Sequence, residues 1–292
     1  MQILMSTYNG ERFLAEQIES LRAQTWKNLE ILIRDDGSKD RTPDILMEYG
    51  KEYKNIKIFL EENKGVSESF FELLKKSDAD FVAFCDQDDI WLEEKIEKAI
   101  EKIDKKKGPV LYCSNKILVD SAGNPMKNQD TRKRIPGFGN AVVECICTGC
   151  TTVMNQEMAR IIKSRLPKHA ILHDWWCYLA ASYVGNVIFD ERAYIRYRQH
   201  GENVVGARAG FWGELQSKAA YLKKSRGKLE KQLSDFAKLY QGDEKKDALV
   251  RKILAARHFP GRITILANRE MYRQSRLDEI VMRILFLINQ MI

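Results

Sequence analysis

Short apolar runs alternate with amphipathic stretches through the first 120 residues of this 292-residue chain. The runs predict strands at residues 3–7, 29–34, 56–60 and 80–85, and the stretches between them predict helices at 11–24, 42–53, 66–75 and 92–103. Such alternation is typical of βαβ units, in which each helix returns the chain so that successive strands lie parallel. The sequence therefore predicts an α/β fold with a mostly parallel central sheet flanked by helices.

The pattern changes after Gly108-Pro109, where the alternation loosens. Further strands are predicted at 110–113 and 151–155, a loop-rich segment at 120–140 and a last amphipathic helix at 277–292. From Gly206 the chain turns helical and charged. We therefore expect two parts, an α/β domain at 1–205 and a helical C-terminal region at 206–292.

The positive charge of the chain is concentrated in this C-terminal region. Residues 206–292 carry 18 Lys and Arg against 9 Asp and Glu, a net of +9, whereas residues 1–205 have a net of −2. A basic helical region can face anionic lipid, nucleic acid or an acidic substrate, or it can be a solvated surface. No motif in this region decides between these roles.

Composition excludes several classes of protein. With 44% hydrophobic and 30% charged residues, the chain is neither disordered nor fibrous, and no window approaches the roughly 18 apolar residues of a spanning helix. The N-terminus leads straight into a strand without the features of a signal peptide, so we expect a cytoplasmic location. The six cysteines are then expected to be reduced thiols, and Cys145, Cys147 and Cys150 lack the second Cys or His pair of a zinc site.

Polar loops follow three of the predicted strands. They are Ser6-Thr7-Tyr8-Asn9-Gly10, Asp35-Asp36-Gly37-Ser38 and Asp86-Gln87-Asp88-Asp89. In a doubly wound sheet the carboxyl ends of the strands meet at one edge, and ligands bind there. The three loops therefore predict a ligand site at that edge of the sheet.

The third loop brings several carboxylates into one small space. Like charges destabilise each other unless a proton or metal offsets them, and oxygen-rich sites suit Mg²⁺ or Mn²⁺ bridging to a phosphate. A divalent cation and a diphosphate ligand are therefore expected. The alternative is a solvated Asp-rich turn that caps a helix beginning near Trp91.

The second loop also has two interpretations. Asp and Gly commonly form an ordinary turn after a strand, because they supply local hydrogen bonds and unusual backbone angles. Beside two other polar loops at the same edge, the same residues instead favour a ligand site.

These loops and two later motifs, His173-Asp174-Trp175-Trp176 and Tyr197-Arg198-Gln199-His200, occur together in one order. The series resembles the family 2 glycosyltransferases with a GT-A fold, most closely the rhamnosyltransferases that build bacterial cell-surface polysaccharides. The resemblance covers roughly residues 1–205. It implies a Rossmann-like GT-A fold and an inverting, metal-dependent sugar transfer.

The resemblance also implies roles for individual residues. The donor-binding residues would be Ser6, Thr7, Tyr8, Asn9, Asp36 and Asp86. The divalent cation, Mn²⁺ or Mg²⁺, would be held by Asp88, with Asp86 and His200 contributing. Asp89 adds a third acid to the motif, so that the oxygen that reaches the metal is not fixed by sequence.

Asp174 is the predicted general base. An inverting transfer needs a base within hydrogen-bond reach of the acceptor hydroxyl, and Asp174 matches the family's base by motif. The alternative is that Asp174 caps the helix that follows Leu172. Trp175 and Trp176 either offer flat surfaces to a sugar ring or fill the core.

Two basic residues and the C-terminus have open roles. Arg198 and Lys64 either pair with phosphate oxygens or are ordinary exposed cations, and the second is the stronger expectation. Residues 283–292 are too short to span a bilayer. Their apolar face either packs on the α/β domain, forms a homo-oligomer or lies in the membrane interface.

The predicted function is transfer of a sugar, with L-rhamnose from dTDP-rhamnose as the leading donor and a UDP-sugar as another, onto a hydroxyl of a cell-surface glycan or polyprenyl-linked acceptor. One alternative is a sugar nucleotidyltransferase, although the Gly-rich basic loop of that class is missing. Another is a non-catalytic scaffold whose basic region binds lipid or polyanions. Because the acidic loops would repel the phosphates of a nucleic acid, no nucleic acid is expected as a partner.

Overall fold

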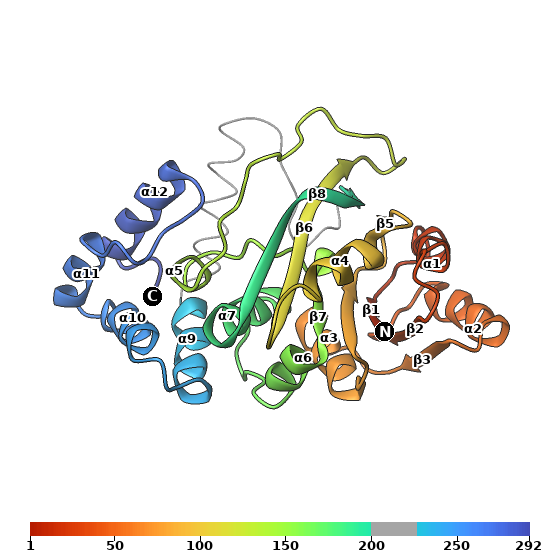
Figure 1. Cartoon of the computed structure of the whole chain (residues 1–292), viewed down its shortest axis with the longest axis horizontal. Helices are drawn as coiled ribbons and strands as arrows, with labels where there is room; N and C mark the ends of the chain where they lie inside the picture. Colours follow the sequence, from red (N-terminus) through yellow and green to blue (C-terminus); the bar gives the residue numbers. More distant parts are fainter. Residues whose placement is uncertain (200–226) are drawn as a thin grey trace.

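The computed structural model describes residues 1–199 and 227–292, and in these residues the strands form one eight-stranded sheet. Its order is β3-β2-β1-β4-β7-β6-β8-β5 (Figure 1). The strands are β1 (Gln2–Thr7), β2 (Glu30–Asp35), β3 (Ile56–Leu60), β4 (Phe81–Cys85), β5 (Ile90–Trp91), β6 (Val110–Val119), β7 (Val153–Asn155) and β8 (Asn186–Arg198). Strands β1 to β4 are parallel, as are β6 and β8, whereas β7 and β5 run antiparallel to their neighbours. The sheet is therefore mixed and mostly parallel, which confirms the predicted α/β class.

Helices cover both faces of the sheet because successive strand residues point to opposite sides. The helices of the α/β part are α1 (Leu14–Arg22), α2 (Thr42–Glu52), α3 (Val66–Lys76), α4 (Lys95–Ile103), α5 (Phe138–Ala141), α6 (Gln156–Lys163) and α7 (His173–Val184). In β1, Ile3 and Met5 join one core with apolar residues of α1, α2 and α4, whereas Leu4 joins a second core with α3, α6 and α7. All three side chains are fully buried.

The predicted elements of the first 85 residues are found within a few residues of their expected ends. Three later elements differ, and one of them is the last predicted helix, which ends at Leu287 rather than at residue 292. Helix α4 begins at Lys95 rather than at residue 92, because Ile90 and Trp91 pair with β8 as a short strand. Strand β6 continues six residues past the predicted end at Cys113, because it pairs along its length with β8 through two register shifts.

The C-terminal region forms α9 (Lys228–Leu239), α10 (Glu244–Ala255), α11 (Phe259–Leu266) and α12 (Arg276–Leu287). Side chains cap two of these helices: Asp243 accepts a hydrogen bond from the backbone N–H of Lys246, and Ser275 accepts one from that of Asp278. The expected boundary between residues 205 and 206 lies outside the described residues, so the division into two parts stays a prediction.

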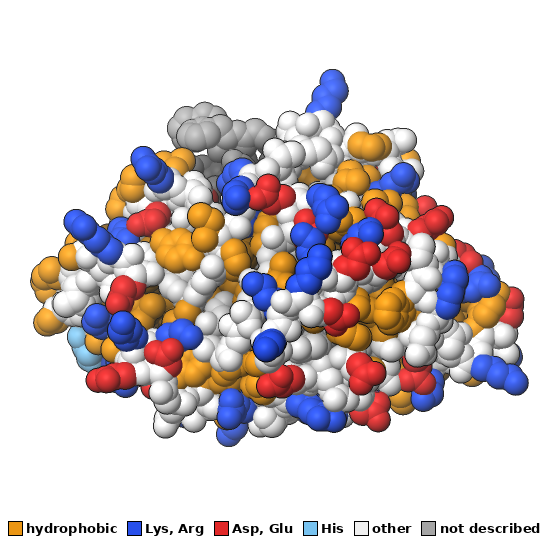
Figure 2. Space-filling model, viewed as in Figure 1, with side chains coloured by type: hydrophobic (Ala, Val, Ile, Leu, Met, Phe, Trp, Pro, Cys, Tyr) orange, Lys and Arg blue, Asp and Glu red, His pale blue; other side chains and the backbone are white. Residues whose placement is uncertain are grey.

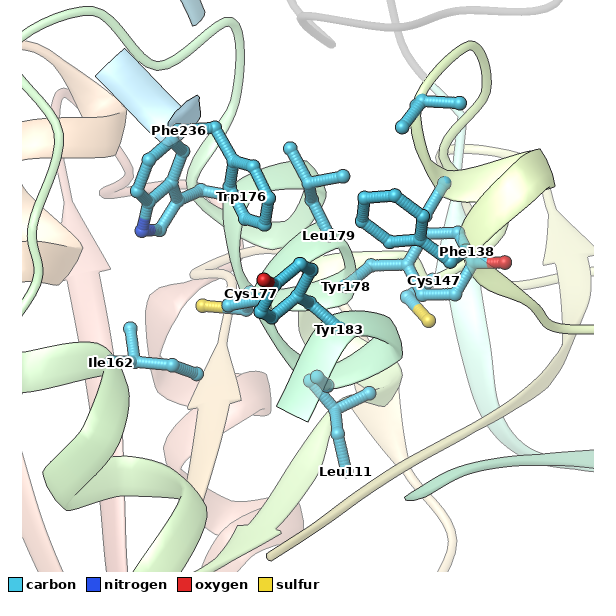
Figure 3. Packing of buried hydrophobic residues seen from close by; sticks show 14 of the residues in the cluster. Leu111, Phe138, Cys147, Ile162, Trp176, Cys177, Tyr178, Leu179, Tyr183 and Phe236 are labelled. Carbon is cyan, nitrogen blue, oxygen red and sulfur yellow. The ribbon is translucent and has the colours of Figure 1, made fainter. Parts of the chain in front are cut away.

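Helix α9 packs against the α/β part through aromatic side chains. The Phe236 ring lies 5.7 Å from Trp176 and 5.5 Å from Tyr183, both on α7, and 5.9 Å from Phe138 on α5 (Figure 3). Helix α7 is apolar on most of its surface because it lies between the sheet and α9. The apolar side of α9 is therefore buried by packing within the chain, against α5 and α7.

Among the described residues no helix is both long enough and apolar enough to cross a lipid bilayer.

Candidate active site

Side chains tie the three polar loops together at the carboxyl ends of β1, β2 and β4. Asn9, in a left-handed conformation with φ of 48°, donates its backbone N–H to Ser38 Oγ at 2.8 Å, and its Oδ1 accepts the N–H of Lys39 at 2.8 Å. The Gln87 side chain accepts the N–H of Tyr8 at 2.8 Å and donates to the Tyr8 carbonyl at 3.0 Å. The loops therefore form one edge, as the sequence predicted.

The residues of the first loop differ in how far their side chains are exposed to solvent. The Thr7 hydroxyl is buried and donates to Asp35 Oδ1 at 3.0 Å, and the Ser6 hydroxyl donates to Ser69 Oγ at 2.7 Å. The Tyr8 side chain is 49% exposed. Tyr8 therefore offers a free aromatic face, whereas Thr7 chiefly shapes the loop.

Asp36 is buried and holds the second loop against the loop that follows β3. Its Oδ1 accepts from Lys64 N and its Oδ2 from Gly65 N, each at 2.8 Å, and Oδ1 also pairs with the buried Arg34 guanidinium. A carboxylate has about four acceptor sites, so these three bonds leave one on Oδ2 unused. Lys64 is 47% exposed and lies 3.6 Å from Glu72, as expected of a surface cation.

The acidic loop is not a solvated helix cap, because β5 lies between it and α4. Asp86 and Asp88 are half-buried and Asp89 is buried. Burial, the Asp88 charge and the Asp174 charge raise the pKa of Asp86 to about 7. Burial and the charges of Asp88 and Asp86 also raise the pKa of Asp89. These carboxylates are held close together against their mutual repulsion.

The donor atoms of this cluster fit a hard divalent cation. Carboxylate oxygens of Asp86 and Asp89 lie within 4.8 Å of each other and of Cys150 Sγ. Asp89 Oδ2 is buried without a hydrogen bond to any nitrogen or oxygen of the described residues. Carboxylates suit Mg²⁺ and Mn²⁺, whereas burial raises the pKa of the Cys150 thiol well above its usual range, so that it is protonated and a poor ligand.

The structure contradicts the expectation that Arg198 is an exposed cation, because its side chain is only 2% exposed. Its Nε donates to the Asp88 carbonyl at 2.9 Å, and its backbone N–H donates to Asp89 Oδ1 at 3.1 Å. Further bonds run to the Ser121 carbonyl at 2.8 Å and to Glu16 at 2.6 Å. Arg198 thus joins the acidic loop to the end of β8. No acidic residue lies next to Arg198 in the sequence, so the sequence gave no indication of this role.

Asp174 lies in the first turn of α7, and the helix N-cap is Leu172, so Asp174 is not the cap. Its Oδ1 accepts from Trp175 N at 2.7 Å and its Oδ2 from Gly149 N at 2.9 Å. Burial raises the pKa of Asp174 to about 6, although these two bonds oppose the shift. A carboxyl with this pKa can accept a proton near neutral pH.

His173, beside Asp174, is a buried neutral residue. Its ring stacks on Phe70 with 4.0 Å between centroids, and burial lowers the pKa of His173 to about 3. Trp176 is fully buried in the core with Phe236, so it cannot be a sugar platform. Trp175 donates its indole N–H to the Ala141 carbonyl at 2.7 Å.

Lys116 on β6 is a site residue that the sequence analysis missed. Its charge lowers the pKa of both Asp86 and Asp174, and its Nζ donates to Thr148 Oγ1 at 3.0 Å. The predicted strand ended at Cys113, so Lys116 was assigned to no element. The signal that could have located it is the apolar continuation Ile117-Leu118-Val119.

The remaining predicted metal ligand, His200, lies outside the described residues. The other predicted residues of the first two loops, the acidic loop and α7 gather at one edge of the sheet. The charge of Asp174 raises the pKa of Asp86, although the two residues are far apart in sequence.

Comparisons with known proteins agree with this architecture. The family described as "Glycosyl transferase family 2" matches residues 2–161. A protein of Shigella flexneri, "dTDP-rhamnosyl transferase RfbG", is 32% identical over 220 residues, which are 71% of this chain and 75% of the relative.

Solved structures share the fold at lower identity. TarS 1–349 of S. aureus in complex with UDP has a TM-score of 0.56 at 20% identity, covering 92% of this chain and 88% of residues 1–349 of TarS. The mannosyltransferase PcManGT of Pyrobaculum calidifontis, in complex with GDP-Man and Mn²⁺, has a TM-score of 0.56 at 13% identity, covering 99% and 85%. The fold is therefore that of GT-A glycosyltransferases. By its family match and its sequence identity to a named relative, the chain belongs to glycosyl transferase family 2 and is a glycosyltransferase.

Proposed function

We propose that this chain is an inverting, metal-dependent transferase that moves L-rhamnose from dTDP-rhamnose to a hydroxyl of a cell-surface glycan or a polyprenyl-linked acceptor. The relative RfbG is named as a dTDP-rhamnosyl transferase, which supports the choice of donor. Neighbours bound to UDP or GDP-Man support a nucleotide-sugar donor in general. We also propose that residues 1–205 form the donor-binding domain and residues 206–292 a separate helical region.

The donor nucleotide would lie along the first two loops. The exposed ring of Tyr8 can stack on the base, and the free acceptor site of Asp36 Oδ2 can receive a pyrimidine N–H. Ser6, Thr7 and Asn9 shape the wall beside the ribose. Asp36 is thereby both an anchor of the loop and a contact for the base.

A divalent cation, Mn²⁺ or Mg²⁺, would be held by Asp88, with Asp86 and His200 contributing, and with the buried Asp89 carboxylate, which lies within 4.8 Å of that of Asp86, beside them. Burial and the charges of Asp88 and Asp174 raise the pKa of Asp86, which supports this assignment, because a bound cation would stabilise the charged form of this carboxylate. When bound, such a cation neutralises charge on a departing nucleoside diphosphate. Arg198 keeps the loop that carries these carboxylates in place.

Asp174 would take the proton of the acceptor hydroxyl as that oxygen attacks the anomeric carbon, on the face opposite the departing diphosphate. The bond from the anomeric carbon to the diphosphate breaks as the bond to the acceptor oxygen forms, so no covalent enzyme intermediate is needed. The observation that carries the proposal is that Gly149 and Cys150, which are adjacent in sequence, contact the two groups: Gly149 N–H donates to Asp174 Oδ2 at 2.9 Å, and Cys150 Sγ lies within 4.8 Å of a carboxylate oxygen of Asp86.

The nature of the acceptor indicates where in the cell the enzyme works. A polyprenyl-linked acceptor lies in a membrane, so we propose that the protein works in the cytoplasm at the inner face of the cell membrane, with peripheral contact through the C-terminal region.

The proposal is tested by thermal unfolding with dTDP or UDP, with and without Mn²⁺. A ligand at about a hundred times its Kd adds about 2.7 kcal/mol to the free energy of unfolding, so the nucleotide should raise Tm only when the metal is present. Asp88→Ala should abolish this shift, whereas Asp104→Ala, which removes an exposed acid at the end of α4, should retain it. No shift with any nucleotide would contradict the proposal.

The donor is tested separately by release of nucleoside diphosphate from a panel of nucleotide sugars. dTDP-rhamnose should give the fastest release in the presence of a glycan acceptor and Mn²⁺. Faster release from a UDP-sugar would replace the proposed donor without changing the reaction type.

A further inference from the structure

Helices α11 and α12 expose many apolar side chains. Of the fourteen exposed large hydrophobic residues in the described chain, nine lie on or next to these two helices. They are Phe259, Ile263, Leu266, Leu277, Ile280, Val281, Ile284, Leu287 and Ile288, and we call them the α11–α12 face. In Figure 2 apolar atoms are visible at the end of the molecule where Figure 1 places the two helices.

The spacing of these residues is helical, so they share one side of each helix. On α12 they recur at intervals of three and four residues from Leu277 onward, and Ile280, with an exposed fraction of 57%, is typical. The opposite side of α12 is buried through Met282 and Phe286. Helix α12 therefore has an apolar stripe toward the core and another toward the outside.

The exposure is not the result of a loosely attached helix. The Arg283 side chain fixes α12 to the end of α11 and to the segment after it. It donates hydrogen bonds to the carbonyls of Ile265 at 2.8 Å, Leu266 at 3.0 Å, Asn268 at 2.9 Å and Met271 at 3.1 Å. The α11–α12 face is thus held outward by partly buried polar contacts of Arg283.

An apolar surface of this extent is unfavourable in water and marks a contact site. The charges around it indicate which kind of contact. From residue 251 onward, five of the six exposed charged side chains are basic: Arg251, Lys252, Arg257, Arg269 and Arg276, with Glu270 as the acidic one. Arg276 directly precedes the apolar stripe of α12, and Arg257 precedes that of α11.

This basic border complements an anionic lipid surface. Arginine side chains at the edge of an apolar face can reach lipid phosphates while the apolar residues enter the acyl region. A second copy of the chain would instead bring two basic borders together around a shared apolar contact. The charge distribution therefore favours lipid over self-association.

The lengths of the helices favour lying flat over insertion. Helix α12 has 12 residues and α11 has 8, which correspond to about 18 and 12 Å at about 1.5 Å per residue, against a hydrocarbon core of about 30 Å. A helix pair of this size can bury one side at the boundary between headgroups and acyl chains.

We propose that the α11–α12 face docks on the surface of an anionic membrane, with its nine apolar side chains in the acyl boundary and Arg257, Arg269 and Arg276 at the lipid phosphates. This deepens the proposed function, on which it rests for the lipid-linked acceptor, because docking brings the active site to a substrate confined to the same surface.

The test is co-sedimentation of the full chain with vesicles. Vesicles of equal parts phosphatidylglycerol and phosphatidylcholine should bind the protein, and pure phosphatidylcholine should bind it weakly. The double variant Ile280→Ser and Ile284→Ser should bind at least about tenfold more weakly. Met47→Ser, an exposed apolar residue on α2, is the matched control and should bind like the wild type.

A charge variant distinguishes the contribution of the arginines at the lipid phosphates from that of the apolar side chains. Arg269→Glu with Arg276→Glu should reduce binding to the phosphatidylglycerol vesicles and leave the weak binding to phosphatidylcholine unchanged, and added salt should weaken the wild type in the same way. Wild-type protein that fails to sediment, or an Ile280→Ser and Ile284→Ser variant that binds normally, would overturn docking. So would a dimer by light scattering that this double variant dissociates.

The same variants, without vesicles, are examined for nucleotide protection in thermal unfolding. Protection should be unchanged in all of them, because the α11–α12 face contains none of the proposed donor-binding residues. Loss of vesicle binding with normal protection would leave the proposed transfer reaction intact. Vesicle binding without protection in the wild type would instead contradict the transfer reaction alone.

Discussion

The acidic edge of the sheet, by which we mean Asp86, Asp88, Asp89 and Asp174, and the α11–α12 face both hold side chains in unfavourable surroundings. Charged groups are buried at the edge, and apolar groups are exposed to water on the α11–α12 face. At the edge, Asp86 and Asp89 are removed from water and placed beside Asp88, which raises the pKa of each. On the α11–α12 face, apolar residues such as Ile284 are held in water at 51% exposure. Each arrangement is unfavourable in the isolated chain and becomes favourable with a suitable ligand.

The two regions differ in what maintains them. The acidic edge is assembled from β1, β2, β4, β8 and α7, which are distant in sequence, and Arg198 links its parts. The α11–α12 face is local and depends on Arg283 and on docking against α5. Changes at the edge should therefore alter chemistry, whereas changes at the C-terminal helices should alter attachment.

The largest effect is expected from Asp174→Asn. An amide cannot accept the proton of the acceptor hydroxyl, so kcat should fall by about a thousandfold, within the range for loss of a general base. The measurement is nucleoside diphosphate release at saturating donor and acceptor. Nucleotide protection with Mn²⁺ should persist, because Asp174 is not among the proposed ligands.

Glu144→Gln, a change of an acid that pairs with Arg273 in the C-terminal region, serves as the control for Asp174→Asn. Its turnover should stay close to that of the wild type. If Asp174→Asn also retained wild-type turnover, Asp174 would have no part in the chemistry.

Gly139→Ala is expected to loosen the C-terminal region without changing the edge. A methyl group at this position would lie 1.8 Å from the backbone oxygen of Glu270, and the Gly139 carbonyl accepts the N–H of Tyr272 at 3.2 Å. Because the obstacle is backbone, relieving it should cost about 1–3 kcal/mol. Urea unfolding and limited proteolysis after residue 259 should show lower stability and faster cleavage, with nucleotide protection retained.

Gly139→Ala also tests whether the acidic edge and the C-terminal helices unfold independently. If the variant lost nucleotide protection together with stability, the C-terminal helices and the edge would form one cooperative unit. Unchanged proteolysis would mean that the segment around Glu270 is not held against α5.

Arg198→Lys tests how far the acidic loop depends on β8. A lysine cannot reproduce the separate bonds to the Asp88 carbonyl, the Ser121 carbonyl and Glu16. Loss of contacts that orient metal ligands typically weakens metal affinity by about tenfold or more. Titration of Mn²⁺ in the presence of dTDP should show this loss, with Lys64→Met as a control at an exposed cation. Equal Mn²⁺ affinity in Arg198→Lys and wild type would contradict the role.

Sequence predicted the parallel part of the fold because local patterns determine it. The apolar runs of β1 to β4 and the turn residues after them place three loops at one edge, and the structure has them there. Lys116 and Arg198 could not be assigned in the same way. Their positions depend on the long pairing of β6 with β8, which has two register shifts that no local pattern specifies.

The C-terminal region shows the same limit of sequence patterns. The apolar period of α12 predicted an amphipathic helix, but two apolar sides occur on this helix, and only the tertiary contacts of Arg283 show which side faces outward. Likewise, Trp176 was a candidate for sugar binding until the position of α9 showed it to be buried. Packing partners distant in sequence decide such cases.

The smallest predicted effect is on the pH dependence of turnover. Burial raises the pKa of Asp174 to about 6, and a general base acts in its deprotonated form. With donor and Mn²⁺ saturating, kcat should therefore be half-maximal near pH 6 and fall about tenfold per unit below it. The measurement is the pH profile of nucleoside diphosphate release.

Lys116→Met gives this profile its sharpest test. The Lys116 cation lowers the pKa of Asp174, so removing it should raise that pKa and move the acidic limb of the profile to higher pH. Lys127→Met, at an exposed lysine in the 120–140 segment, should leave the limb in place. A limb that stayed unchanged in Lys116→Met would show that the titrating group is not Asp174, and would place the base elsewhere on the acidic edge.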